Sequence, residues 1–263
     1  MSVDTEPTCY ARPVLETGDF TQQAAAYARA RPSYPREFVG RLLDAARVPA
    51  GKAIVEIGAG TGRLTRELVA LGCRVIAVEP NAAMRDRAEP QDERVRWVDG
   101  TFERTDLPPD SAPWIVAAQA FHWADPPVAL AELRRIAAPG ARLTVMWNDR
   151  DNAASPMLTW TQQLIRDQIP EFNARYRDRD WSQVLGSTND FADVSVDEAR
   201  HRVQMTAARY VDLWRSHHRL TVAAGPDRME AFCRLVAAEL QRRGLHRLDV
   251  PYCCRAYSAT ARG

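Results

Sequence analysis

A glycine-rich stretch, followed by an acidic residue further along the chain, carries the clearest chemistry in this sequence. Val55-Glu56-Ile57-Gly58-Ala59-Gly60-Thr61-Gly62 joins an apolar run to three alternating glycines, and Glu79 ends the next apolar run. Glycines let a backbone turn sharply and approach a ligand closely, and a carboxylate at the end of the second strand can accept hydrogen bonds from both hydroxyls of a ribose. The pattern predicts a nucleoside-binding site at the carboxyl edge of a parallel sheet.

The spacing of the glycines separates this loop from the dinucleotide fingerprint. That fingerprint reads GxGxxG, whereas here Gly62 comes one residue early and Arg63 follows it. Glu56 is also unusual for a dinucleotide site, because a carboxylate just before the loop would repel a pyrophosphate. A carboxylate suits a ligand that brings a positive charge, such as a sulfonium or an amino group.

The elements that must position these residues alternate along the first 150 residues. Apolar runs at 53–57, 74–78, 95–98, 114–118 and 143–147 predict buried strands, and helical patterns occupy 64–71, 82–88 and 128–136. This alternation predicts a parallel sheet with helices on both faces. Further helices are expected at 21–30 and 36–46, and helices and loops over 155–190. The last third predicts strands at 194–205 and 248–259 and helices at 207–215 and 228–243.

Composition limits the function classes. The chain has 263 residues, is 46% apolar and carries a formal net charge of +1. Near-neutral charge gives no reason to expect a nucleic acid or an anionic membrane as partner. We expect no signal peptide and no membrane span. The five cysteines follow no disulfide or metal pattern, which favours a cytoplasmic protein with reduced thiols. We expect a monomer or a homodimer.

The glycine segment resembles motif I of class I S-adenosylmethionine-dependent methyltransferases, and further matches follow in chain order. Asp99-Gly100-Thr101-Phe102 is similar to the segment that flanks adenine in relatives. Ala118-Gln119-Ala120-Phe121-His122-Trp123 resembles the segment after the fourth strand, and Leu133-Arg134-Arg135-Ile136-Ala137-Ala138-Pro139-Gly140 the segment before the fifth. Tyr27-Ala28-Arg29-Ala30-Arg31-Pro32-Ser33-Tyr34-Pro35 is similar to the N-terminal segment of a small-molecule branch that includes type 11 and trans-aconitate methyltransferases.

The resemblance covers residues 20–150 well and the last third in outline. It implies an α/β fold: a Rossmann-like, doubly wound, seven-stranded and mostly parallel sheet, with an antiparallel last strand and a helical cap or insert. It also implies three regions. Residues 1–50 would be an N-terminal helical cap segment, residues 51–150 the cofactor-binding core, and residues 151–263 the completion of the sheet with a helical insert on the substrate side.

The implied activity is transfer of a methyl group from S-adenosyl-L-methionine to a small molecule by in-line displacement. The donor is already activated, so positioning can supply much of the catalysis, about 7–11 kcal/mol. The resemblance implies that the following residues bind the cofactor: Tyr27, Arg31, Tyr34, Glu56, Gly58, Gly60, Gly62, Glu79, Pro80, Met84, Thr101, Phe102 and Gln119. Within this set, Arg31 could pair with the cofactor carboxylate.

Three residues are candidates for the reacting centre. His122 follows the fourth strand and could act as a general base, or could only hold its loop through a backbone contact. Trp123 could line the pocket or stabilise a sulfonium by a cation–π contact. His217 is a second candidate base, although the sequence favours a solvated helix end for it and its neighbour His218. The histidines are scattered, so no metal site is expected.

Other interpretations stay open at this point. A nicotinamide-dependent oxidoreductase shares the strand–glycine–helix–strand–acid order, although the early third glycine and Glu56 argue against it. A methyltransferase fold that binds the cofactor without transferring its methyl group would carry the same motifs. Asp125-Pro126-Pro127-Val128 resembles the tetrad of DNA amino-methyltransferases, but it comes later than theirs and ends in Val128 where they carry an aromatic residue. The atom that accepts the methyl group does not follow from the sequence.

Overall fold

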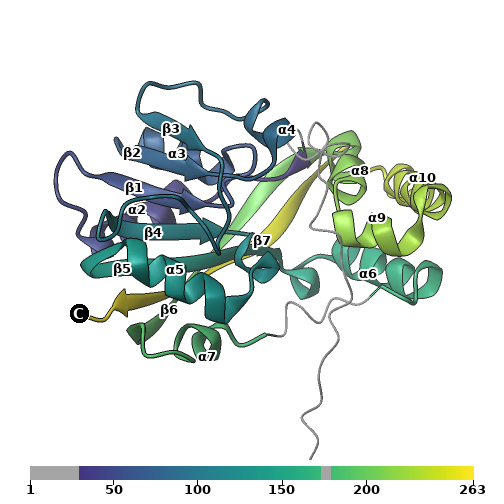
Figure 1. Ribbon diagram of the computed structural model, residues 1–263. Coiled ribbons are helices and arrows are strands. Elements are labelled where there is room, and N and C mark those ends of the chain that lie inside the picture. The colour runs from purple at the N-terminus through teal and green to yellow at the C-terminus, as the bar shows by residue number, and fades with distance from the viewer. Residues whose placement is uncertain (1–29, 173–178) are drawn as a thin grey trace, which may run out of the picture.

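Seven strands form one sheet in a computed structural model of the protein, which describes residues 30–172 and 179–263. The strand order is β3-β2-β1-β4-β5-β7-β6 (Figure 1). Strands β1 to β5 pair in parallel, and β7 pairs antiparallel with both β5 and β6. The strands are β1 (Ala53–Ile57), β2 (Arg74–Val78), β3 (Val95–Val98), β4 (Ala112–Ala118), β5 (Ala137–Arg150), β6 (Phe191–Thr206) and β7 (Arg247–Ala261). This sheet confirms the predicted fold class, including the antiparallel last strand.

Helices cover both faces of the sheet, as the alternation of strands and helices predicts. Val55 and Ile57 of β1 pack in a core with α5 (Pro126–Ile136) and α7 (Trp181–Leu185). Ile54 points to the other face, where the core includes α2 (Arg36–Ala46) and α3 (Arg63–Ala70). Since side chains alternate along a strand, Glu56 shares the α3 face with Ile54. A short helix, α4 (Ala82–Arg85), follows β2.

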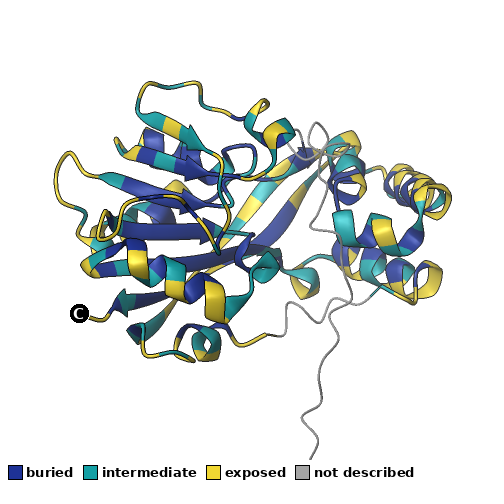
Figure 2. Cartoon of the chain, viewed as in Figure 1, coloured by how far each residue is buried: buried dark blue, intermediate teal, exposed yellow. Residues whose placement is uncertain are grey.

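A third hydrophobic cluster lies beyond the carboxyl edge of the sheet. It unites four helices, α6 (Pro156–Gln168), α8 (Ala207–Arg215), α9 (His218–Ala224) and α10 (Pro226–Arg242), with the ends of β6 and β7. Trp214 and Phe232 are buried at its centre, and Val250 and Tyr252 of β7 belong to it. These helices are called the cap below. Figure 2 shows their inward sides buried and their outward sides exposed.

Several boundaries differ from the predictions. Strand β5 begins at Ala137, not near residue 143, because Ala137 already pairs with Ala112 of β4. It runs to Arg150 because β7 pairs with it as far as that residue. Helix α9 was not predicted. Helix α4 ends at Arg85, short of the predicted residue 88. The predicted helix over 21–30 and the predicted cofactor residue Tyr27 lie outside the described residues, apart from Ala30.

Within the described parts of the chain, no helix combines the length and apolarity that crossing a membrane requires.

Candidate active site

The three glycines of the loop after β1 have different surroundings. A Cβ on Gly58 would lie 2.5 Å from the Cβ of Ala120, and one on Gly62 would lie 1.9 Å from the carbonyl oxygen of Glu89. A Cβ on Gly60 would meet no atom of the described residues within 4 Å. All three residues have positive φ, which glycine adopts without strain. Gly58 and Gly62 therefore fit the loop against its neighbours, whereas Gly60 leaves open space in which a ligand can approach the backbone.

Glu79 lies directly beside this open space. One carboxylate oxygen accepts a hydrogen bond from the backbone N–H of Gly60 at 2.8 Å, and the other from that of Asn81 at 2.9 Å. Arg85 donates to the backbone carbonyl of Glu79. Each carboxylate oxygen keeps a further lone pair, so the group can still accept hydroxyls. Burial raises the pKa of Glu79, against these stabilising hydrogen bonds. The residues present thus fit the ribose of a nucleoside cofactor.

Glu56 has a structural contact on the α3 face. It is 2% exposed, and its carboxyl accepts a hydrogen bond from the Thr65 hydroxyl at 2.7 Å. Burial raises its pKa to about 8. The carboxyl therefore ties β1 to α3 and stays largely protonated at neutral pH. A direct contact between Glu56 and a cationic ligand stays a prediction.

The remaining predicted residues near the nucleoside end are mostly committed to local structure. Met84 is buried in α4, whose N-terminus is capped by Asn81, and Pro80 is exposed before it. The Thr101 hydroxyl accepts hydrogen bonds from two backbone N–H groups in its own turn. Phe102 packs edge-on against Phe121, with ring centroids 5.3 Å apart. These contacts shape the loops around the glycines, and a role of each residue in cofactor binding is still a prediction.

The segment Arg31-Pro32-Ser33-Tyr34-Pro35, here called the strap, connects the cap to the sheet. Arg31 donates to the hydroxyl and the carbonyl of Ser216, both at 3.2 Å, at the end of α8. The Ser33 hydroxyl donates to Glu67 of α3 at 2.6 Å, and the Asn148 amide of β5 donates to the Ser33 carbonyl at 3.2 Å. The strap is therefore fixed at both ends across the carboxyl edge of the sheet.

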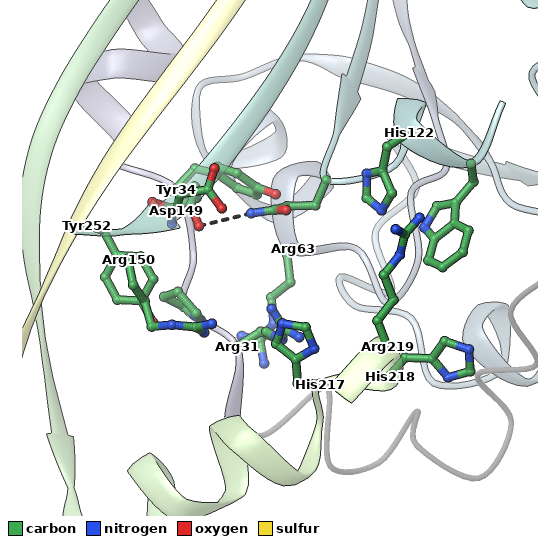
Figure 3. Close-up of a pocket in the computed structure, with 14 residues that line it drawn as sticks. Arg31, Tyr34, Arg63, His122, Asp149, Arg150, His217, His218, Arg219 and Tyr252 are labelled. Carbon is green, nitrogen blue, oxygen red and sulfur yellow. Dashed lines mark hydrogen bonds between the residues drawn. The ribbon is translucent and has the colours of Figure 1, made fainter. Parts of the chain in front are cut away.

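A cavity lies between the strap, the sheet edge and the cap (Figure 3). It brings together six of the predicted site residues: Arg31, Tyr34, Gln119, His122, Trp123 and His217. The glycine loop and Glu79 are not among the residues that line it. Arg63, which directly follows Gly62, does line it, so the cavity adjoins the glycine loop at that residue.

His122 stands in the short 3-10 helix η1 (Phe121–Trp123) after β4. Its Nδ1 accepts a hydrogen bond from the indole N–H of Trp147 at 3.4 Å. A neutral imidazole that accepts through one nitrogen carries its hydrogen on the other, so this contact assigns the hydrogen to Nε2. In that tautomer Nε2 of His122 is a hydrogen-bond donor, and a role as general base would need the other tautomer.

His217 shows the same arrangement on the cap. It is the N-cap of α9, where its Nδ1 accepts from the backbone N–H of Leu220 at 3.3 Å, which again leaves the hydrogen on Nε2. Its ring stacks on Trp214 with 6.5 Å between centroids and 9° between planes. The guanidinium of Arg150 lies 4.2 Å from the centre of the same indole. His217 and Arg150 are thereby placed around one buried tryptophan.

Trp123 is surrounded by the cap. Arg219 of α9 lies 4.8 Å above its ring, and the rings of His122 and His218 lie 4.9 Å and 6.2 Å from it. Arg219 of the cap is therefore one cation that contacts this indole. Stabilisation of a sulfonium by Trp123 stays a prediction.

Sequence reasoning missed most of the charged residues in the cavity. Among the described residues that line it, four are arginines, three are histidines and one is an aspartate. The residues not predicted include Arg63, Arg150 and Arg219. Arg150 ends β5 and Arg63 begins α3. The carboxyl end of a parallel strand and the start of the following helix are ligand-binding positions, so this signal could have identified both.

Comparison with known proteins agrees with the fold and the loop. Residues 55–145 match the family model described as a methyltransferase domain. An uncharacterized methyltransferase of Mycobacterium tuberculosis is 39% identical over 145 residues, which cover 55% of this chain and 56% of the relative. An uncharacterized methyltransferase of Schizosaccharomyces pombe is 32% identical over 147 residues, which cover 56% of this chain and 58% of the relative. The chain thus matches a little over half the length of these curated relatives.

Solved structures share the architecture over most of the chain. A structure from Anaeromyxobacter dehalogenans, provisionally assigned as a type II methyltransferase, superposes with a TM-score of 0.64 at 22% identity and covers 88% of this chain and 97% of its own. Phosphoethanolamine N-methyltransferase 2 of Haemonchus contortus, solved with S-adenosyl-L-methionine, superposes with a TM-score of 0.54 at 15% identity. The superposition covers 95% of this chain and 61% of that chain. At these identities the likeness concerns the fold.

The sheet order, with the glycine loop after β1 and the acid at the end of β2, defines a Rossmann-like fold. The family match within it is more specific: residues 55–145, less than half of the chain, match a methyltransferase domain.

Proposed function

We propose that this protein transfers the methyl group of S-adenosyl-L-methionine to a small-molecule acceptor held in the cavity. One observation carries the proposal: the open backbone at Gly60, with the Glu79 carboxylate 2.8 Å from its N–H, adjoins a cavity built from the strap, the sheet edge and the cap. A nucleoside held at the loop would extend its other end toward this cavity. The strap and the cap narrow the approach, which favours a small acceptor.

When bound, the cofactor supplies a methyl group already activated on a sulfonium. The chain's own residues position the reactants. Glu79 holds the ribose, and Arg31 or Arg63 pairs with the carboxylate of the methionine moiety at the strap end of the cavity. Gln119, which donates to the Asn148 carbonyl at 2.9 Å, fixes the turn after β4 where donor and acceptor meet. Holding two reactants in line accounts for about 7–11 kcal/mol of a barrier of this kind.

Release of S-adenosylhomocysteine tests the proposal. Purified protein and S-adenosylmethionine are incubated with pooled acceptors grouped as carboxylates, phosphomonoesters, phenols and alcohols, and amines. The expected result is release of S-adenosylhomocysteine that depends on one acceptor class and disappears in Glu79→Ala at a cofactor concentration well below its dissociation constant. Cofactor binding without acceptor-dependent release from any pool would contradict methyl transfer to a small molecule.

A further inference from the structure

Asn148 connects three segments that surround the cavity. It lies near the end of β5, is 7% exposed and lines the cavity. Its side-chain amide donates to the Ser33 carbonyl of the strap at 3.2 Å, and its Oδ1 lies 2.9 Å from Nε2 of His201 on β6. Its backbone carbonyl accepts from the side-chain amide of Gln119, in the turn after β4, at 2.9 Å. One residue of the sheet edge thus contacts the strap, β6 and the turn after β4.

The partners of Asn148 decide which way its amide points. A backbone carbonyl can only accept, so the amide nitrogen faces Ser33 and the amide oxygen faces His201. Nε2 of His201 is therefore the donor of that hydrogen bond. Burial lowers the pKa of His201, so at neutral pH its ring is neutral and carries one N–H, which it donates to Asn148. His201 thereby holds the amide in the orientation that the strap requires.

Asn148 contacts the strap at the middle of the part that forms a wall of the cavity. Pro32 and Tyr34 both line the cavity, and Ser33 lies between them. The hydroxyl of Ser33 donates to Glu67 of α3 at 2.6 Å, whereas its carbonyl accepts from Asn148 of β5. The bond from Asn148 therefore ties the strap to a residue of the sheet that lines the same cavity.

The turn after β4 is held against the same residue. Gln119 has a φ of 56°, a left-handed conformation that is uncommon for a residue other than glycine. Its backbone N–H donates to the Met146 carbonyl at 2.8 Å, and its side-chain amide donates to Asn148. Backbone strain of this kind persists where the surrounding structure fixes it. The strap and this turn, which both line the cavity, are thus positioned through adjoining atoms of Asn148.

Resting on the proposed function, we infer that Asn148 is a positioning residue: it sets the spacing between the strap and the turn after β4, and so the shape of the cavity in which the ligand binds. His201 acts through Asn148 by orienting its amide. His201 is not among the described residues that line the cavity, and β6 is the last strand in the order of the sheet. A residue of an edge strand thus affects ligand binding without contacting the ligand.

Two substitutions of His201 test the inference without altering a residue of the cavity wall. His201→Phe keeps a ring that can stack on Tyr252, whose ring centroid lies 5.6 Å away, but removes the donor to Asn148. His201→Gln restores a side-chain N–H donor. In titration calorimetry with S-adenosylhomocysteine, we expect His201→Phe to bind about threefold to tenfold more weakly than wild type, and His201→Gln to bind within about twofold of it. Equal affinity of the two variants would overturn the inference.

Asn148→Ala removes the side-chain bonds and leaves the backbone carbonyl that accepts from Gln119. It should weaken binding of S-adenosylhomocysteine about tenfold, and adding His201→Phe should weaken it no further, because His201 acts through Asn148. The matched control is Thr144→Val, at a buried residue of the same strand whose hydroxyl lies 2.9 Å from that of Ser258. It should lower the free energy of unfolding and leave the affinity unchanged. Additive losses in the double variant, or an equal loss of affinity in Thr144→Val, would contradict the positioning role.

The proposed function and the positioning role fail in different ways. If the wild-type protein does not bind S-adenosylhomocysteine, the proposed function is contradicted and the positioning role falls with it. If the wild-type protein binds S-adenosylhomocysteine and Asn148→Ala binds it equally well, the proposed function stands and the positioning role of Asn148 is wrong.

Discussion

Glu79 and Gly60 are joined by a hydrogen bond of 2.8 Å from the backbone N–H of the glycine to the carboxylate. The bond links the end of β2 to the tip of the loop after β1, nineteen positions earlier in the chain. It fixes the carboxylate next to Gly60, whose Cβ position has open space among the described residues, unlike those of Gly58 and Gly62. A single acid thus orders the loop and stays available to a ribose.

Glu79→Ala should weaken binding of S-adenosylmethionine by about 1.5–3 kcal/mol, the range for hydrogen bonds to charged groups. Titration calorimetry measures the cofactor affinity. The control variant is Glu230→Gln, at an exposed acid of α10. Because burial raises the pKa of Glu79, the affinity of the wild-type protein should also fall as the pH drops into that raised range and the carboxylate takes up a proton. An affinity unchanged in Glu79→Ala would contradict the ribose role.

Gly60→Ala should separate stability from binding. Gly72 is the matched control, because it too has a positive φ and no atom of the described chain within 4 Å of an added Cβ. Both substitutions should lower the free energy of unfolding by about 1 kcal/mol, the cost of left-handed backbone for alanine. Only Gly60→Ala should lose cofactor affinity, since its methyl group fills the space beside Glu79. Equal affinity in the two variants would show that the cofactor does not approach Gly60.

Glu56→Gln should change how stability depends on pH. Burial raises the pKa of Glu56 from 4.5 to about 8, so between these values the folded protein holds a proton that the unfolded chain has released. The free energy of unfolding then falls as pH rises through this window, by an amount on the order of a few kcal/mol. Denaturant melts at pH 5 and pH 8 should show this fall reduced in Glu56→Gln. An equally steep fall in the variant would mean that another group causes it.

His122→Ala should leave cofactor affinity nearly unchanged and lower turnover only a few-fold. The reason is the contact at 3.4 Å from the Trp147 indole, which assigns Nδ1 as acceptor and leaves Nε2 as donor. A general base would contribute about 10²–10⁴-fold and would add a limb to the pH–rate profile near the pKa of histidine. A loss of that size, together with disappearance of such a limb, would establish His122 as the base.

The sequence predicts the core of this fold well because local signals and tertiary demands agree there. The strands over 53–57 and 74–78 are short, apolar and bounded by turn residues, and they form as predicted. The extensions of β5 and β7 depend on their pairing with each other, which no local pattern encodes. Helix α9 escaped prediction because it is one of several short helices whose position depends on packing around Trp214.

The candidate site also contains residues that local sequence patterns predict and residues that they do not. Gly60 and Glu79 act through backbone geometry at a fixed spacing, so their types reveal their roles. Arg150 and Arg219 come from β5 and from the cap, and only the folded chain brings them into one cavity. Glu56 shows that a motif position does not by itself reveal a contact. Its position in the motif suggests a ligand contact, whereas its hydrogen-bond partner in the structure is Thr65.

Titration of the purified protein with S-adenosylmethionine decides whether the glycine loop and Glu79 form a cofactor site. We expect saturable binding at one site per chain, with weaker binding by Glu79→Ala and Gly60→Ala, and no competition by NAD(H). The absence of any binding heat at high micromolar cofactor, or binding of NAD(H) in its place, would contradict it.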